Sequence, residues 1–373
     1  MTAVLGVLNK HAVAIAADSA VTVQNPLGRK VLNSANKIFM LSKYHPIGIM
    51  LYSSASFMGV PWEIIVKLYR EEIKDNSFST VSDYANDFLV FLKNKNYFSD
   101  NQTNLKYLGG IINRIFDDIS KIALSSNGGS ITDENKVSFI YYFVKKRDEL
   151  KGIFSKLETC DNFVDYDLES FKAYSKETFD AIFDGYIFKN LKEFELPDDF
   201  RPALEETIYT IIKAKETALG YTGLIFVGYG EDEIYPSIIP INVSIVVENR
   251  LRYFFDKNKS DSITEQNTAS ICSFAQTDVI DTILTGIDPG LEEIFNRNFI
   301  DTIKKYNSLL SDVIRPDNPD LAKSIDDLDC ELLANEFRDL NQEIKRKHYI
   351  GPLVETVATL SKEDLAEMVE SLI

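Results

Sequence analysis

The chain has 373 residues, and its 57 Asp and Glu outnumber its 40 Lys and Arg, which gives a formal net charge of −17. A surface this acidic repels phosphate groups, so neither nucleic acid nor an anionic membrane is expected as a partner. The hydrophobic fraction of 45% is that of a folded chain and argues against intrinsic disorder.

Cysteine and histidine are scarce, which limits the chemistry that the chain can perform. The three cysteines are widely spaced, so neither a disulfide framework nor a paired-cysteine zinc site is expected. No two of the three histidines stand at metal-ligand spacing. A histidine-based zinc hydrolase is therefore not expected.

The N-terminal segment lacks the features of a targeting signal. Its apolar start is interrupted by Asn9, Lys10 and His11, and no basic leader precedes it. No apolar run reaches the ~18 residues that a membrane-spanning helix needs. The expectation is a soluble, cytoplasmic protein with no membrane partner.

The first 60 residues are expected to form strands. Residues 2–8 and 12–17 are short runs rich in Val, Leu, Ile and Ala, and the polar residues 9–11 between them indicate a hairpin turn. Residues 37–41 and 47–52 predict a second pair of strands.

A helix is expected after Pro61, and the chain that follows is largely helical. Helical spacing of apolar residues recurs near residues 82–95, 105–124, 136–158, 168–193 and 201–219. We interpret residues 75–220 as a helical insertion, and residues 1–74 and 221–373 as the core that receives it.

Strand patterns return after the helical insertion, and helices then follow to the end of the sequence. Strands are predicted near residues 223–229, 237–247 and 269–274. Helices are predicted near residues 277–285, 290–314, 327–346 and 352–372. This order favours an α+β fold with two packed sheets covered by helices over an alternating β-α-β fold.

Thr2 is the residue that suggests a chemistry. The nucleophile elbow, the P-loop, the HExxH motif and the dinucleotide-binding GxGxxG motif are all missing from the sequence. Thr2 is small enough for methionine aminopeptidase to remove Met1, which would leave a threonine with a free α-amine. Such an amine, with a pKa of about 8, can take the proton of the same residue's hydroxyl.

The residues that follow Thr2 strengthen this interpretation. The first strand leads to Asp18-Ser19-Ala20-Val21-Thr22, and Asn36-Lys37-Ile38 comes next. This arrangement resembles the start of proteasome β-subunits and of their bacterial heat-shock relative, which are N-terminal-nucleophile (Ntn) threonine peptidases. The interval from Thr2 to Asp18 matches that family, whereas the interval to Lys37 is slightly longer, in a loop with Pro26 and Gly28.

The resemblance implies a role for each of these residues. Lys37 would supply a positive charge that lowers the pKa of the Thr2 hydroxyl, and Asp18 would keep Lys37 charged and oriented. The alternative is that Asp18 and Lys37 form an ordinary ion pair between neighbouring strands. Lys30 is a competing lysine, but it lacks the Asn-Lys-Ile context.

Three serines complete the site that the resemblance implies. Residues 52–59 take the place of a segment whose glycine amide forms the family's oxyanion hole, so the backbone N–H of Ser54 or Ser56 is the candidate donor. Residues 223–242 look like a strand pair of the family. Ser273 then matches the serine that hydrogen-bonds to the amine of the nucleophile. The alternative is that Ser273 is a buried serine whose hydroxyl is satisfied elsewhere.

The fold implied by the resemblance is a four-layer αββα Ntn-hydrolase sandwich with a large helical insertion, and the family's last strands have no counterpart. The implied activity is hydrolysis of peptide or other amide bonds through Thr2 after removal of Met1, with no metal and no cofactor. The implied partners are a peptide or protein substrate, further copies of the chain in a ring or stack, and an ATPase or another protein bound through residues 75–220.

Two alternatives stay open. The first is a catalytically silent relative that acts in assembly or sensing and docks partners on the helical insertion. The long insertion and the missing glycines favour it, whereas the joint presence of Thr2, Asp18 and Lys37 favours an enzyme. The second is an effector held inactive by a retained Met1, because a blocked amine cannot act as a base.

Overall fold

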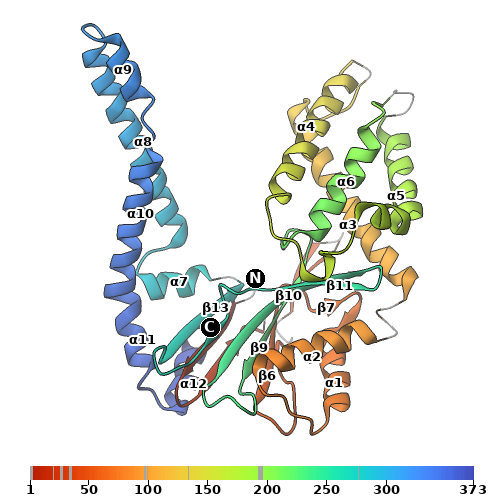
Figure 1. Cartoon of the computed structure of the whole chain (residues 1–373), viewed down its shortest axis with the longest axis vertical. Coiled ribbons are helices and arrows are strands. Elements are labelled where there is room, and N and C mark those ends of the chain that lie inside the picture. Colours follow the sequence, from red (N-terminus) through yellow and green to blue (C-terminus); the bar gives the residue numbers. More distant parts are fainter. Residues whose placement is uncertain are drawn as a thin grey trace. The chain divides into compact units, whose positions relative to one another are not determined.

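The protein is a mixed α+β protein with 54% helix, 18% strand and antiparallel sheets, which confirms the α+β part of the predicted fold. The structure is a computed structural model (Figure 1). It describes residues 3–19, 21–25, 28–32, 36–95, 98, 100–132, 134–191, 196–275 and 277–373, with side chains except at 21–25, 28–32 and 187–190.

The chain divides into two compact units. Unit 1 combines the two ends of the sequence, Met1–Ala35 and Asp261–Ile373, and unit 2 is the continuous segment Asn36–Ser260. These boundaries differ from those of the predicted core and insertion. The predicted division describes a relationship to the Ntn family, and it stays a prediction.

The sheet of unit 1 has three strands with β1 in the middle. β1 (Ala3–Asn9) pairs antiparallel with β2 (Val13–Ala17) on one side and with β13 (Ala269–Ala275) on the other. The predicted hairpin between β1 and β2 is confirmed. Asn9 forms its turn, because its side-chain oxygen accepts hydrogen bonds from the backbone N–H groups of His11 and Ala12.

Helices cover one face of this sheet. α7 (Asp278–Thr285), α11 (Gly351–Val357) and α12 (Lys362–Ser371) enclose a small core. Its buried members include Leu5, Val7, Ile280, Val357, Leu365 and Val369. The Asn9 carboxamide also donates to the carbonyls of Val357 and Leu360, both at 2.9 Å, which ties the hairpin turn to these helices.

A long helical hairpin belongs to the same unit. α8 (Pro289–Ile314) and α10 (Glu331–Lys345) run antiparallel, and α9 (Pro319–Asp326) lies at the far end of the pair (Figure 1). The rings of Phe299 and Phe337 stack between α8 and α10 with centroids 4.2 Å apart. A π-helical turn, Arg346–Ile350, joins α10 to α11.

The main sheet of unit 2 is antiparallel, in the order β11-β10-β9-β6-β5. These strands are Ile38–Met40 (β5), Ile47–Tyr52 (β6), Thr222–Gly228 (β9), Ser237–Val247 (β10) and Arg250–Phe255 (β11). α1 (Trp62–Ile73) and α2 (Val81–Asn94) pack on it. Trp62, Phe88 and Phe226 are among the rings buried in this first core of unit 2.

The remaining helices of unit 2 form a second core. They are α3 (Asn101–Ser126), α4 (Lys136–Phe154), α5 (Leu168–Asn190) and α6 (Phe200–Lys213), with the short 3₁₀ helix Asp161–Phe163. The sequence predicted these helices. α2 also lies in the predicted insertion, but it packs against the sheet in the first core.

Five short strands complete the described elements. They are Val21–Asn25 (β3), Gly28–Leu32 (β4), Ser56–Phe57 (β7), Val60–Pro61 (β8) and Asp261–Ser262 (β12). β3 and β4 pair with each other in the segment around Pro26 and Gly28, for which the sequence predicted a loop. In strands of only five residues, the alternation of apolar and polar residues is too weak a pattern to distinguish a hairpin from a loop.

Candidate functional site

The residues of the expected site are distributed over both units. Asp18 and Ser273 belong to unit 1, and Lys37, Ser54 and Ser56 belong to unit 2. Thr2 lies outside the residues that the structure describes, and so does the side chain of Lys30.

Asp18 is held against the first described residue of β1. The backbone N–H of Ala3 donates to Oδ1 of Asp18 at 3.0 Å, and the backbone N–H of Asp18 donates to the carbonyl of Ala3 at 3.1 Å. Asp18 directly follows β2, whose last residue, Ala17, pairs with Val4. The pairing of β1 and β2 therefore places a half-buried carboxylate beside the residue that follows Thr2 in the sequence.

Ser273 lies on the other neighbour of β1. It pairs with Leu5, and Ala275 on the same strand pairs with Ala3. The Ser273 hydroxyl donates to Oδ1 of Asp281 at 3.2 Å. Since this bond uses the hydroxyl proton, the Oγ lone pairs of Ser273 can still accept a hydrogen bond.

Sequence reasoning did not identify Asp281. It lies in the first turn of α7, the helix that follows β13, eight residues after Ser273. The signal was a strand serine followed by an acidic first turn of a helix. That signal was hidden because acidic residues are common in this chain and favour first turns for reasons unrelated to catalysis.

Cys272 is the neighbour of Ser273 on β13, and it is unsuited to act as a nucleophile. Burial raises the pKa of its thiol to about 11, despite a contact with the Ser270 hydroxyl at 3.4 Å. Since the thiolate is the reactive form, Cys272 is inert near neutral pH. Ser270 itself donates a hydrogen bond to Asp261.

Lys37 is buried in unit 2, immediately before β5. Lys37 is only 9% exposed, and its backbone carbonyl accepts a hydrogen bond from the N–H of Leu51 at 2.8 Å. A buried ammonium requires polar partners, and neither Lys37 nor Asp18 is without one.

The oxyanion candidates lie in a tight turn after β6. Ser53 has a φ of 73°, in the left-handed region that non-glycine residues rarely adopt. The N–H of Ser54 donates to the carbonyl of Tyr52 at 3.1 Å, and the N–H of Ser56 donates to Oγ of Ser54 at 3.3 Å. Both candidate donors are therefore engaged within the turn, and oxyanion binding would require either of them to exchange its acceptor.

Hydrogen bonds from buried side chains attach the turn to the sheet. Oγ1 of Thr222 on β9 donates to the carbonyl of Ser54 at 3.4 Å and accepts from the indole N–H of Trp62 at 2.9 Å. The hydroxyl of Tyr52 donates to Oδ1 of Asn242 at 3.3 Å. These buried contacts fix the ends of the turn, so its left-handed residue is held by the surrounding structure.

No protein-family model, no curated protein and no solved structure matches the chain. Within the described ranges, none of the helices has both the length and the apolar character needed to cross a membrane.

Proposed function

We propose that the protein is an Ntn hydrolase that cleaves peptide or other amide bonds through Thr2 after removal of Met1. In this proposal the fold is a variant of the four-layer αββα sandwich. The enzyme works as an oligomer of identical chains and receives its polypeptide substrate with the help of a partner protein.

The observation that carries the proposal is the hydrogen bond from the Ala3 N–H to the Asp18 carboxylate. It supports the alignment of Asp18 with the acidic residue of the Ntn family, which the sequence spacing suggested. The hydrogen bond from Ser273 to Asp281 also supports the proposal. It orients the Ser273 hydroxyl, whose oxygen can accept a hydrogen bond, on the strand that pairs with β1.

The proposed reaction has two steps. The Thr2 hydroxyl attacks the amide carbonyl while the α-amine of Thr2 takes its proton, and the amine then gives that proton to the leaving nitrogen. Water hydrolyses the resulting ester and frees Thr2. Asp18 and Lys37 tune the nucleophile, and Ser273, oriented by Asp281, accepts a hydrogen bond from the α-amine. Because Lys37 belongs to unit 2, its role is a prediction that substitution must test.

A catalytically silent relative is the second candidate, and the turn after β6 favours it. The N–H groups of Ser54 and Ser56 both have acceptors inside the turn. A protein that uses the scaffold only for assembly or sensing needs no free oxyanion donor.

A peptidyl epoxyketone tests the proposal, because its adduct needs both the hydroxyl and the free amine of an N-terminal threonine. We expect intact mass spectrometry to show loss of Met1 and one adduct per chain, and no adduct with Thr2→Ala. If Met1 is retained, cleavage of an N-terminal fusion that leaves Thr2 as the first residue supplies the free amine.

Asp18→Asn is the sharpest companion variant. Asparagine keeps an oxygen that can accept from the Ala3 N–H but removes the negative charge, so the strand pairing should survive. We expect adduct formation to slow about 100-fold or more. Lys37→Met should have a comparable effect. A folded protein with a free Thr2 and no adduct would contradict the enzyme and favour the silent relative.

A further inference from the structure

A pocket of about 360 Å³ lies at the base of the α8–α10 hairpin, within unit 1. This is at the lower end of the range of 300–1,000 Å³ that is usual for binding pockets. It is lined by residues of α8, α10, the π-helical turn, the end of α7 and the segment that joins α7 to α8. It shares no lining residue with the proposed catalytic site.

Two unusual backbone features form one wall of the pocket. Gly286 ends α7 with a φ of 75°, and a Cβ at this position would lie 2.9 Å from the ring of Tyr349. Tyr349 itself lies in the π-helical turn Arg346–Ile350, and such turns occur mostly as single bulges that are frequent at functional sites. The close approach of Tyr349 therefore depends on a glycine and on an irregular helix.

The pocket carries no net charge, and apolar side chains form part of its wall. Phe295, Phe337 and Ile344 contribute to its lining. Glu292 and Lys345 also line it, but their side chains form an ion pair at 2.5 Å, with exposures of 27% and 16%. An uncharged apolar group suits such a pocket, since a charged group would lose its hydration without gaining an opposite charge.

Two carboxamides add hydrogen-bonding capacity. Asn296 of α8 and Asn341 of α10 line the pocket, and neither side chain makes a hydrogen bond to any part of the chain that the structure describes. Each carboxamide offers one acceptor and two donors, which complement the N–H and C=O groups of a peptide.

Apolar side chains continue beyond the pocket. Leu291 on α8 and Leu340 on α10, which directly precede the lining residues Glu292 and Asn341, are 44% and 54% exposed. An occupant longer than a single side chain can bury them as well, which is the arrangement of a protein interface with a central anchor pocket.

We infer that this pocket binds a peptide segment of a protein partner, with a bulky uncharged side chain such as Phe or Leu as the anchor. The peptide groups on either side of the anchor bond to Asn296 and Asn341. This inference is independent of the proposed hydrolase, since none of its residues takes part in that chemistry.

Capped amino acids test the inference with the intact protein. Saturation-transfer NMR titrations would compare N-acetyl-phenylalanine amide and N-acetyl-leucine amide with the glutamate and lysine analogues, and with ethylbenzene, which lacks peptide groups. We expect the two apolar amides to bind at least 5-fold more tightly than the other three compounds.

Asn296→Leu has a matched control in Asn298→Leu, the same substitution two residues along α8 at an exposed position that does not line the pocket. We expect Asn296→Leu to weaken binding about 5-fold, as loss of a neutral hydrogen bond does, and Asn298→Leu to change nothing. Asn341→Trp should fill the pocket and abolish binding. Thermal melts would confirm that each variant is folded.

Three results would overturn the inference. One is the absence of binding by both apolar amides. Another is equal binding of ethylbenzene, which would indicate a generic apolar cavity. The third is an equal effect of Asn296→Leu and Asn298→Leu, which would place the compounds elsewhere.

Discussion

Arg252 is a buried cation that joins the two cores of unit 2. It lies on β11 with 1% of its surface exposed, and its guanidinium donates to the carbonyls of Ile212, Ala214 and Glu216 and to Oγ of Ser244, at 2.5–3.0 Å. Burial lowers the pKa of the guanidinium, which nevertheless stays charged. The first two carbonyls belong to the C-terminal end of α6, where helices leave acceptors unpaired.

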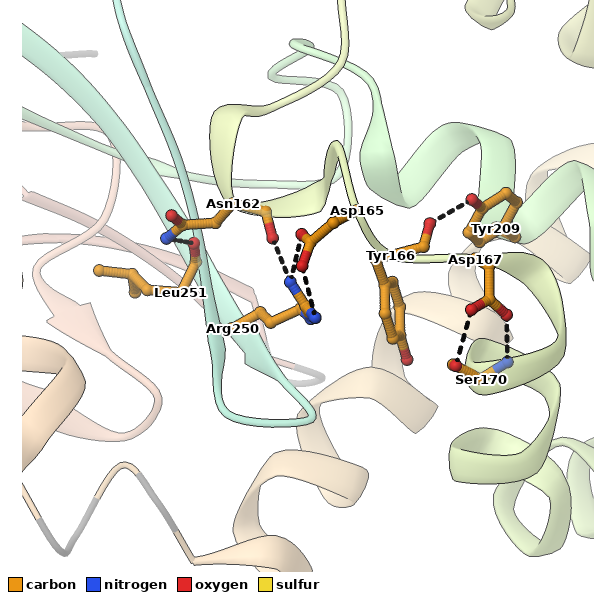
Figure 2. A network of polar contacts seen from close by, with 8 residues as sticks. All are labelled: Asn162, Asp165, Tyr166, Asp167, Ser170, Tyr209, Arg250 and Leu251. Carbon is orange, nitrogen blue, oxygen red and sulfur yellow. Dashed lines mark hydrogen bonds and ion pairs between the residues drawn. The ribbon is translucent and has the colours of Figure 1, made fainter.

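Arg252→Met should destabilise the protein by about 3 kcal/mol or more, because it leaves several buried carbonyls without donors. Arg250→Met, two residues away on the same strand, is the matched control. Arg250 pairs with the exposed Asp165 and donates to the carbonyl of Asn162 (Figure 2). A partly exposed pair of this kind contributes about 1 kcal/mol or less.

Urea unfolding followed by circular dichroism would measure both variants. Equal losses of stability for Arg252→Met and Arg250→Met would contradict the role given to the buried guanidinium.

At the scale of residues, the sequence indicated which side chains are candidates for the site, but not the hydrogen bonds that they form. Asp18 was selected by its spacing from Thr2, and its contact with Ala3 agrees with the predicted hairpin. Asp281 was missed because its contact with Ser273 depends on how the chain turns from β13 into α7, which residue types do not indicate. The internal bonds of Ser54 and Ser56 depend on the left-handed backbone at Ser53, which no pattern of residue types indicated.

The pairing of β6 and β9 depends on one glycine. Gly223 pairs with Tyr52, and a Cβ added to Gly223 would lie 1.9 Å from the Tyr52 ring. The missing side chain lets the ring lie flat across the neighbouring strand and reach Asn242 with its hydroxyl. This contact fixes the strand that leads into the Ser53–Ser56 turn.

Gly223→Ala should therefore cost about 1–3 kcal/mol through overpacking. Gly110→Ala is a control of opposite sign. Gly110 lies on an exposed face of α3 with no atom within 4 Å of an added Cβ, so alanine should stabilise the helix by about 0.5–1 kcal/mol. Melting temperatures of the two variants that move in the same direction would contradict this argument.

Elements with strong local signals were predictable. The polar residues 9–11 marked the β1–β2 turn, which the structure contains. The chain from 352 to 372 was expected as one helix, but α11 ends at Val357 and α12 begins at Lys362. The break was missed because residues 358–360 contain neither glycine nor proline. The second helix begins with a capping box formed by Ser361 and Asp364.

Unit 2 is a continuous segment with its own hydrophobic cores. Both of its large clusters of buried side chains lie wholly between Leu41 and Leu251. We therefore expect residues 36–260, expressed alone, to fold and to unfold cooperatively in urea. Well-dispersed amide NMR signals and resistance to limited proteolysis would confirm this. A collapsed fragment without dispersed signals would show that unit 2 depends on unit 1.

At the scale of the molecule, the sequence indicated the order of strands and helices and the α+β class. It did not indicate that β1 pairs with β13, because contacts between such distant segments leave no periodic signal. The helical insertion was predicted from residue 75, yet α2 completes the core on the sheet, since the ring of Phe88 stacks on Trp62 and contacts Phe226 edge-on.

The central position of β1 has a consequence for the time course of biosynthesis. Its neighbour β2 is made almost at once, but its partner β13 lies about 270 residues further along the chain. At a synthesis rate of about 5–20 residues per second, the ribosome needs roughly 15–55 seconds to reach it. For that interval one edge of β1 remains unpaired, so the sheet of unit 1 can be completed only late in synthesis.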